Sequence, residues 1–570
     1  MVNSETKIKQ AVIMLTAAFL SGSAWAEDSK VENVPTTMQS FDREVKACAE
    51  LLRLPGLSLA VVKDGTIIHR LRLGVADLES KKPFDDESIF WLSSVTKTFS
   101  AVMMMQYEQE GRIALDDPLI KYPFTSVGFF PQRIVPSVQL KHVLSHTSES
   151  IPGTTFVYHG GRYNFIYGVF QVMSGLKFPE AYNRELETRI IQPLGLGGTL
   201  AGYPSTNKES VRARIVTPYS YDSARKEFTV NRGALNPGAA YPGSGLLSCI
   251  KDLAAYTSSF DENRLLPKAS YQKMTSPFIC NDGRASAYGL GWFVTDFNGA
   301  ALHWAYGLGD SDSAILMRVP GRKLSMILLC NSSFATAPAR LGGGNPFTSP
   351  FVVSFLKYFV CENDVALPEI NYDGDVEKIR GSLLQRLAQK PRSICVSELL
   401  SQAQTRSFVE ATFNTPTGQG EALTQLLFEF DREAFTKNDP AVFHLLSLHP
   451  GPALDDAFRL AVESYQAARR FHPWILYSIA KRFEAKGDTD NAMKYFHLLA
   501  DTPGFEEEGE KVRACSSLAR QYAKEGNLEK AREYFWRALV FTRQTGGNEA
   551  KILKELDELN KLPTVSKSPE

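Results

Sequence analysis

Short β-like runs lie at both ends of the first 360 residues, with helical patterns between them. Leu57–Lys63 and Thr66–Arg70 flank the turn dipeptide Asp64-Gly65, which is typical of a β-hairpin. Further strand-like runs lie at Ala301–His303, Ser313–Val319 and Leu324–Leu329. A longer stretch, Thr96–Gln109, has the pattern of an amphipathic helix. The order predicts an α+β fold: one antiparallel sheet built from distant segments, flanked by helices, with a helical subdomain.

The strand patterns end near residue 360. A linker is predicted at 360–375, where the chain is acidic and contains proline, and residues 376–570 have helical patterns only. Five positions there recur after a shift of 39 residues: Ala480, Phe483, Gly487, Ala492 and Phe496 return as Ala519, Tyr522, Gly526, Ala531 and Phe535. This resembles two tetratricopeptide repeats, at about 472–502 and 511–541, whose usual period is about 34 residues. The extra residues are expected in a loop within Thr502–Glu510; two unrelated amphipathic helices are the alternative.

Residues 1–26 have the pattern of a secretory signal peptide. Lys7 and Lys9 precede an apolar run, Ala11–Leu20, and Ala24-Trp25-Ala26 follows as a cleavage site. The apolar run is too short to span a bilayer, which takes about 20 apolar residues. We therefore expect a bacterial protein exported to the periplasm or the medium, beginning near Glu27 and without a transmembrane segment. A buried N-terminal helix is the alternative.

Composition favours a large folded protein without a nucleic-acid partner. The 570 residues are 44% hydrophobic and 22% charged, which is enough apolar material for sizeable cores. Since 63 basic residues balance 63 acidic ones and no basic stripe is present, nucleic acid is not an expected partner. The seven cysteines are scattered without a C-x-x-C pair, which indicates buried thiols rather than a metal site. No cofactor motif is present, so none is expected.

Ser94–Lys97 is an S-x-x-K motif at a predicted strand-to-helix step. If Ser94 opens the helix, Lys97 lies one turn later on the same face, where its amine can accept or relay the hydroxyl proton. Other serines also have a lysine three residues on, among them Ser174, Ser223, Ser270 and Ser354. Ser94 differs because an apolar run, Ile89–Leu92, precedes it and an amphipathic helix follows. Unpaired N–H groups at such a helix start can stabilise an oxyanion.

Eight fragments follow one another in the order known from one family. They are Val61–Gly65, Gly74–Asp77, Ser93–Thr98, Leu115–Leu119, Val143–Ser148, Gly243–Leu247, Asp252–Ala254 and Tyr288–Trp292. This part of the chain, about residues 45–335, resembles the penicillin-recognising serine hydrolases: class C β-lactamases, D-alanyl-D-alanine carboxypeptidases, esterases and D-aminopeptidases. The resemblance implies a β-lactamase/transpeptidase-like domain at 41–359 and an acyl-enzyme formed at Ser94.

Tyr158 matches the tyrosine of the family's Tyr-x-Asn motif. It lies shortly after Pro152-Gly153, and Gly160 stands where asparagine is usual. A free phenol has a pKa of about 10, and the ammonium of Lys97 is expected to lower it. Tyr158 would then take the serine proton and later pass it to the leaving group. Tyr163 is the rival candidate for this role.

The family's third motif, Lys-Thr-Gly or His-x-Gly on a strand, is incomplete. Ala305 stands at the cationic or imidazole position, while Gly307 remains and the N–H of Leu308 can complete an oxyanion hole with that of Ser94. His303 lies on the same strand face, about 6.6 Å away. His303 either replaces in part the cationic or imidazole side chain that Ala305 lacks, or it is a histidine hydrogen-bonded at a strand end. Since the missing group holds a substrate carboxylate in the family, an ester or uncharged amide is the better expected substrate.

Two functional hypotheses remain open. The first is an exported serine hydrolase for a small-molecule or peptide substrate (esterase, peptidase or β-lactamase-like), whose helical repeats serve docking or stability. The second is a catalytically eroded fold that binds a protein partner through the repeats. Ser94, Lys97 and Tyr158 favour the first, whereas Gly160 and Ala305 keep the second open.

Three further features are expected to be structural rather than chemical. His146 lies in a turn of the family and is not expected to be a catalytic histidine. Gly342–Gly344 is expected to be a flexible surface loop, and Lys551–Lys561 a solvated helix that caps the repeats.

Overall fold

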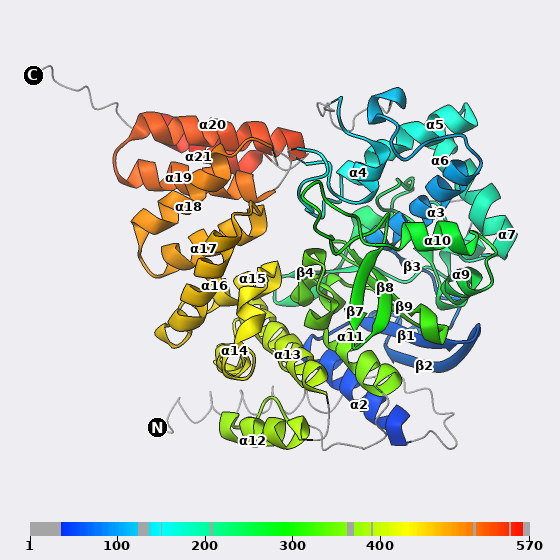
Figure 1. Ribbon diagram of the computed structural model, residues 1–570, viewed down its shortest axis with the longest axis horizontal. Helices are drawn as coiled ribbons and strands as arrows, with labels where there is room; N and C mark the ends of the chain where they lie inside the picture. Colours follow the sequence, from blue (N-terminus) through cyan, green and yellow to red (C-terminus); the bar gives the residue numbers. More distant parts are fainter. Residues whose placement is uncertain are drawn as a thin grey trace, which may run out of the picture.

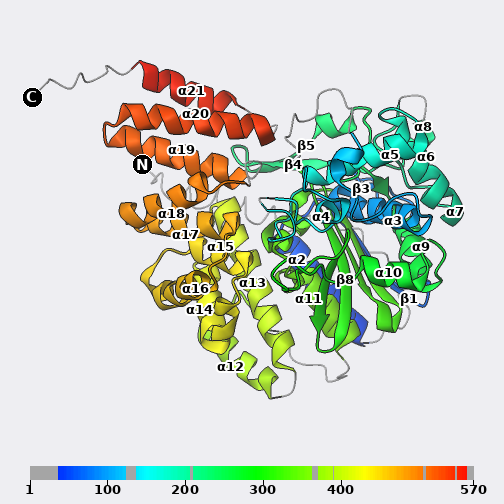
Figure 2. The same ribbon diagram turned by 45° about the horizontal axis from the view of Figure 1, so that its top comes forward.

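The computed structural model describes residues 36–123, 136–149, 151–205, 209–361, 370–388, 391–504, 509–545 and 549–561. The predicted signal peptide and most of the predicted linker lie outside these ranges. In Figure 1 and Figure 2 a part built around a sheet lies beside a stack of helices formed by the second half of the chain. Among the helices in the described ranges, none combines the length and the apolar character needed to cross a membrane.

A six-stranded antiparallel sheet, in the order β2-β1-β10-β9-β8-β7, forms the centre of the first part. Its strands are β1 (Gly56–Lys63), β2 (Thr66–Gly74), β7 (Phe293–Phe297), β8 (Ala300–Leu308), β9 (Ser313–Val319) and β10 (Leu324–Cys330). The predicted hairpin and the three later strands are thereby confirmed. Pairing of β1 with β10 joins distant segments into one sheet, so the predicted α+β class is also confirmed.

Helices cover both faces of this sheet, which is why β9 and β10 are buried along their whole length. One face packs on α2 (Thr36–Leu51) and α11 (Pro350–Phe355). The other packs on α3 (Thr96–Gln109), α9 (Ile250–Asp261) and α10 (Lys268–Met274). The bounds of α3 are those that the hydrophobic pattern predicts.

Smaller elements complete the first part. Its other helices are α4 (Leu140–Leu144), α5 (Tyr167–Ser174), α6 (Glu180–Leu186), α7 (Gln192–Leu194) and α8 (Glu209–Arg212). Two short antiparallel pairs join β3 (Phe90–Trp91) to β6 (Leu247–Ser248) and β4 (Tyr219–Asp222) to β5 (Glu227–Val230). The β3–β6 pair matters for function because it leads directly into the predicted nucleophile.

The second part is a stack of helices with a hydrophobic core of its own. The helices are α12 (Val376–Leu387), α13 (Arg392–Phe413), α14 (Gln419–Phe430), α15 (Pro440–Leu448), α16 (Asp455–Ala468), α17 (Pro473–Ala485), α18 (Thr489–Asp501), α19 (Gly509–Lys524), α20 (Leu528–Thr545) and α21 (Ala550–Asn560). Helix α21 covers α20 at the end of the stack, where the sequence predicts a capping helix.

The positions that recur after 39 residues occupy equivalent places in two helical hairpins, α17–α18 and α19–α20. Gly487 and Gly526 close the two turns with φ of 75° and 79°, values that favour glycine. Ala480 and Ala519 are fully buried between packed helices. Part of the loop expected within Thr502–Glu510 falls on residues 505–508, outside the described ranges. Membership of the tetratricopeptide class stays a prediction.

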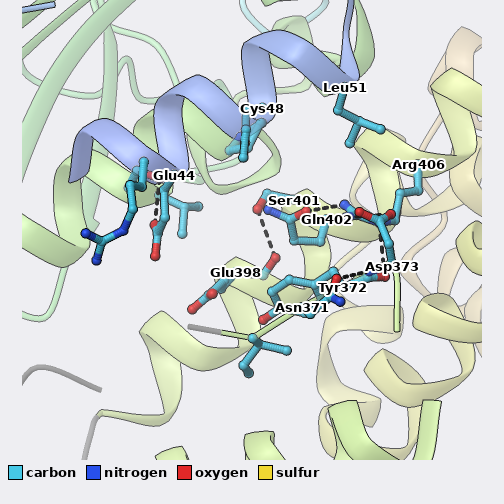
Figure 3. A pocket seen from close by; sticks show the side chains of 16 residues that line it. Glu44, Cys48, Leu51, Asn371, Tyr372, Asp373, Glu398, Ser401, Gln402 and Arg406 are labelled. Carbon is cyan, nitrogen blue, oxygen red and sulfur yellow. Dashed lines mark hydrogen bonds and ion pairs between the residues drawn. The ribbon is translucent and has the colours of Figure 1, made fainter. Parts of the chain in front are cut away.

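Buried ion pairs join the helical stack to the sheet-containing part around a pocket of about 320 Å³ (Figure 3). Glu44 of α2 pairs with Lys357, which follows α11 and also lies 3.6 Å from Glu398 of α13. Glu398 is in turn 2.5 Å from Arg386 of α12. Glu44 and Glu398 are thus both paired with cations of the protein itself, and these ion pairs connect the two parts. We call this region the joint between the two parts.

Gly342–Gly344 does not form a surface loop. Leu341 and Gly342 are buried, and a Cβ on Gly342 would lie 2.7 Å from Trp474 of α17 and 2.8 Å from the hydroxyl of Tyr306. The prediction was wrong because the surface that covers this segment comes from a helix more than a hundred residues further along the chain.

The seven cysteines are free thiols, and all but Cys361 are buried. The structure therefore confirms the prediction of buried thiols for the other six.

Candidate active site

Ser94 lies at a sharp turn between β3 and α3. The turn is a short 3-10 helix, Ser93–Val95, in which Ser93 has a left-handed backbone with φ of 42°. The Ser93 hydroxyl donates a hydrogen bond of 2.5 Å to Asp312, between β8 and β9. The turn is thus tied to the central sheet, while Ser94 itself is only half-buried and remains accessible.

Lys97 is held against the hydroxyl of Ser94. Its side chain is 1% exposed, and its Nζ donates hydrogen bonds to Ser94 Oγ at 2.8 Å and to the carbonyl oxygen of Gly243 at 2.9 Å. Burial disfavours the charged ammonium and lowers the pKa of Lys97 to about 7. A large fraction of the amine is therefore neutral, and able to accept a proton, near neutral pH.

Tyr158 completes a group of three with Ser94 and Lys97. Lys97 Nζ lies 5.2 Å from the centre of the Tyr158 ring. Burial raises the pKa of Tyr158, and a hydrogen bond from Ser94 only partly opposes this rise. The prediction that Lys97 lowers the pKa of Tyr158 was wrong. Burial destabilises both charged forms, so a neutral amine beside a neutral phenol is the favoured state.

Tyr163 occupies a different environment from Tyr158. It is fully buried, and its phenol donates a hydrogen bond of 3.4 Å to the backbone carbonyl of Lys97. Its ring centre is 5.7 Å from Lys97 Nζ. This places Tyr163 underneath the first turn of α3, where it supports Lys97. The structure brings Tyr158, rather than Tyr163, to the nucleophile.

Gly307 lets the turn that carries Ser94 lie directly on β8. A Cβ at Gly307 would be 2.2 Å from the carbonyl oxygen of Leu92, so no other residue fits without moving backbone. Strand β7 pairs with β8 only over Ala300–Trp304. In the described part of the chain, no strand therefore covers this edge of β8 beside Leu308, which is 44% exposed.

His303 and Ala305 lie on the opposite face of β8 from Tyr306 and Leu308, as strand alternation requires. Nδ1 of His303 is 2.9 Å from the hydroxyl of Tyr271 on α10. Burial, and then the charge of Arg318, lower the pKa of His303 to about 4, so this histidine is neutral. These contacts favour the interpretation of a hydrogen-bonded histidine rather than a substitute cation. Ala305 is packed in the core.

Gly160 and His146 are the two remaining residues for which the sequence predicts a place near the site. A Cβ at Gly160 would meet nothing within 4 Å, so an asparagine would have space there. His146 packs on Tyr158 with ring centres 4.4 Å apart, and its Nδ1 accepts the backbone N–H of His159 at 3.2 Å. Burial holds the pKa of His146 well below its ordinary value. It therefore supports the tyrosine as a neutral aromatic side chain.

Two supporting residues were not predicted. Asn164 accepts the backbone N–H of Gly243 at 2.8 Å and so fixes the carbonyl that binds Lys97. Asp312 holds Ser93, and burial raises its pKa to about 6. Gly243 belongs to one of the eight fragments, but nothing in the sequence connects Asn164 or Asp312 with the serine.

A pocket of about 560 Å³ opens beside the catalytic group. On one side it is lined by Tyr158, Tyr306 and Leu308, and on the other by residues of α15, α17 and α19. The helical stack therefore forms one wall of the candidate active site.

The β-lactamase family model matches residues 41–343, just over half of the chain. The chain therefore belongs to the β-lactamase family, and the resemblance stated from the eight fragments is confirmed.

Its relatives include a D-aminopeptidase of Gluconobacter oxydans (strain 621H), 24% identical over 53% of this chain and 61% of the relative. They also include a β-lactamase of Psychrobacter immobilis, 24% identical over 40% of this chain and 58% of the relative. The chain thus spans about three fifths of the length of these two proteins. Among solved structures, an octameric penicillin-binding protein homologue from Pyrococcus abyssi aligns with 56% of this chain and 77% of its own, at 21% identity and a TM-score of 0.45.

Proposed function

We propose that this protein is a serine hydrolase that cleaves an ester or amide through an acyl-enzyme at Ser94. The observation that carries the proposal is the 2.8 Å hydrogen bond from Lys97 Nζ to Ser94 Oγ, in a setting that lowers the pKa of the amine to about 7. A nucleophile needs a base that is unprotonated at the working pH and within hydrogen-bonding reach, and Lys97 meets both conditions.

The proposed acylation begins when Ser94 Oγ attacks the substrate carbonyl and its proton passes to the neutral amine of Lys97. The N–H groups of Ser94 and Leu308 stabilise the oxyanion. The phenol of Tyr158 gives its proton to the leaving oxygen or nitrogen as the carbonyl bond breaks, and the ammonium of Lys97 reprotonates it. Water then hydrolyses the acyl-enzyme by the same transfers in reverse.

The names of the relatives support acyl transfer and leave the substrate open. The D-aminopeptidase and the β-lactamase named above both act on amide bonds, one of a peptide and one of a lactam. We extend the proposal to esterase, peptidase or β-lactamase-like activity in an exported protein. Export is tested by fractionating cells that express the full chain and measuring the mature N-terminus, which we expect near Glu27.

An acylating probe tests the proposed chemistry. A fluorophosphonate or a penicillin is incubated with the wild type and with Ser94→Ala, and the intact mass is measured. We expect an adduct on the wild type that Ser94→Ala does not form. If neither probe modifies the wild type, that result supports the second hypothesis, an eroded member of the family that binds a partner through its helical stack.

A further inference from the structure

The pocket beside Ser94 contains an aromatic surface of which the proposed catalytic steps use only one end. That end is Tyr158, which is hydrogen-bonded to Ser94 and also lines the pocket. The ring of Tyr306, on β8, follows at a distance of 5.4 Å between ring centres. Leu308 lies two residues further along β8 and is 44% exposed. The lining is therefore apolar where the pocket meets the catalytic group.

The aromatic surface continues onto the helical stack through Trp474 of α17. A Cβ on Gly342 would lie 2.7 Å from the Trp474 indole and 2.8 Å from the Tyr306 hydroxyl, so both rings approach one point above this glycine. Gly342 thus has no side chain that would separate the two rings. Tyr477 lies one helical turn beyond Trp474 on the same face of α17. We call these residues the aromatic wall: Tyr158, Tyr306, Trp474 and Tyr477.

Three rings of the aromatic wall keep part of their surface open to the pocket. Tyr158, Trp474 and Tyr477 are half-buried, whereas Tyr306 is 8% exposed. An aromatic ring gains most from a second ring that packs against it with an offset or edge to face, because such pairs are favourable beyond the apolar area that they bury. The exposed ring surface therefore favours a ligand that itself carries an aromatic ring.

The cationic side chains that also line this pocket interact with carboxylates of the protein itself. Lys481 forms an ion pair with Glu484. Arg513 forms one with Glu510, whose charge also acts on Arg340. Since protein carboxylates already act on these three cations, we assign recognition of the substrate to the ring surfaces.

We propose that the aromatic wall binds an aromatic ring of the substrate, so that the helical stack contributes to specificity through Trp474. The inference rests on the proposed function, because Tyr158 belongs to both the catalytic group and the aromatic wall. A substrate whose carbonyl reaches Ser94 places its ring between β8 and α17. The pocket volume of about 560 Å³ accommodates such a ring. Esters and amides that carry an aromatic ring are therefore the substrate class.

This specificity would come from a part of the chain outside the family domain. Trp474 and Tyr477 lie beyond residues 41–343, the segment that the β-lactamase family model matches. Because neither residue belongs to a family motif, the selection of an aromatic ring would be a property of this chain. The substrate class stays within the uncharged esters and amides that Ala305 leads us to expect.

Two pairs of neutral esters test the proposal, each pair differing only in whether a six-membered ring is aromatic or saturated. For the acyl side they are methyl 3-phenylpropanoate and methyl 3-cyclohexylpropanoate. For the leaving-group side they are benzyl acetate and cyclohexylmethyl acetate. Each kcat/KM, measured by titrating the acid released, is divided by the rate constant for hydroxide hydrolysis of the same ester. We expect the wild type to prefer the aromatic member of at least one pair by about threefold or more.

Variants of α17 identify the rings responsible. Trp474→Leu is expected to bring the normalised ratio of the two esters close to one, whereas Trp474→Phe keeps part of the preference because it still presents a ring. Trp536→Leu is the matched control and should keep the wild-type ratio, since Trp536 is 55% exposed on α20 and does not line the pocket. Melting temperatures check folding. Should Trp474→Leu melt too low to assay, Tyr477→Leu takes its place with the same expected result.

The outcomes separate this inference from the proposed function. If the probes acylate Ser94 but the wild type prefers neither aromatic ester, the aromatic wall does not select the substrate and the hydrolase stands. The same conclusion follows if Trp474→Leu keeps the preference, or if Trp536→Leu loses it equally. If Ser94 is not acylated by any probe or ester, both proposals fall together.

Discussion

Lys97 is the residue on which the proposed chemistry depends, because the fold hides it from water while leaving Ser94 accessible. A charged lysine beside the serine would only orient the hydroxyl, whereas a neutral one can take its proton. The left-handed Ser93 turn, the Gly243 carbonyl and the ring of Tyr163 together hold the amine in this position. The base is therefore produced by burial rather than by a neighbouring charge.

The activity should rise with pH through the pKa of Lys97. The neutral amine is the active form and its pKa is lowered to about 7, so kcat/KM for a neutral ester is expected to increase tenfold per pH unit below 7 and level off above it. Tyr158→Phe should lower the rate by about 100-fold or more but leave this inflection in place. Rates measured from pH 5.5 to 9.5 check both statements. A flat profile would show that Lys97 is not the base.

Asp312 should make stability fall between about pH 4 and pH 6. Burial raises its pKa from 3.8 to about 6, so the folded state keeps a proton that the unfolded chain has already lost. The stabilisation that this proton provides is therefore complete at pH values below the pKa of Asp312 in the unfolded chain. It is lost as the pH rises through the pKa of Asp312 in the folded protein. A rise of two pKa units corresponds to a change of about 3 kcal/mol in the free energy of unfolding.

The comparison variant for this prediction is Asp312→Asn, which can still accept the Ser93 hydrogen bond. Urea unfolding of both proteins at pH 4, 5, 6 and 7 should show the variant gaining stability relative to the wild type as pH rises. A difference that stays constant over this range would contradict the assignment.

Elements with strong local patterns could be predicted, whereas contacts between distant elements could not. The β1–β2 hairpin and α3 follow from the spacing of apolar residues and from one turn dipeptide. The burial of Gly342 could not be foreseen because Trp474 covers it from another part of the chain. The pKa of Tyr158 was mispredicted for the same reason: enclosure is a property of the assembled fold.

Gly307 is the point where two elements of the site approach most closely. In Gly307→Ala the new Cβ would overlap the carbonyl of Leu92, which is backbone and cannot rotate away. The turn carrying Ser94 should shift, which we expect to destabilise the protein by about 1–3 kcal/mol and to slow acylation by about 100-fold. Denaturant unfolding and the rate of probe labelling measure the two effects.

Gly321→Ala is the matched control for this substitution. A Cβ at Gly321, in the turn between β9 and β10, would meet nothing within 4 Å. Its stability and labelling rate should equal those of the wild type. If both alanine variants behave alike, close packing of the serine turn on β8 is not what positions the nucleophile.

At the scale of the whole molecule, the joint between the two parts is connected to a wall of the candidate active site. The helical stack contributes a wall of the pocket beside Ser94, yet it is attached by ion pairs around the separate pocket of Figure 3. Helix α13 takes part in this joint through Glu398 and also packs on α15, which lines the active-site pocket. A disturbance of the joint is therefore expected to reach the substrate wall.

Glu398→Gln tests this connection because Glu398 sits between two buried cations, Lys357 and Arg386. Although burial opposes ionisation, those cations lower the pKa of Glu398, so its stabilisation is present at neutral pH and lost as pH falls through that lowered pKa. Removing the charge breaks the ion pairs of Glu398 with Lys357 and Arg386, at a loss of about 3–5 kcal/mol. Glu463→Gln, in the exposed pair with Arg459, should lose at most about 1 kcal/mol. Guanidinium unfolding compares the two.

The same pair of variants should differ in substrate selection. If the joint holds the wall of the active site, Glu398→Gln is expected to change the ratio of kcat/KM values for two esters of different acyl length at temperatures where it remains folded, while Glu463→Gln keeps the wild-type ratio. Labelling of Ser94 by a fluorophosphonate should persist in both, because Lys97 and Tyr158 belong to the sheet-containing part. A variant that is destabilised but selects esters as the wild type does would show that the joint stabilises the stack without setting the pocket.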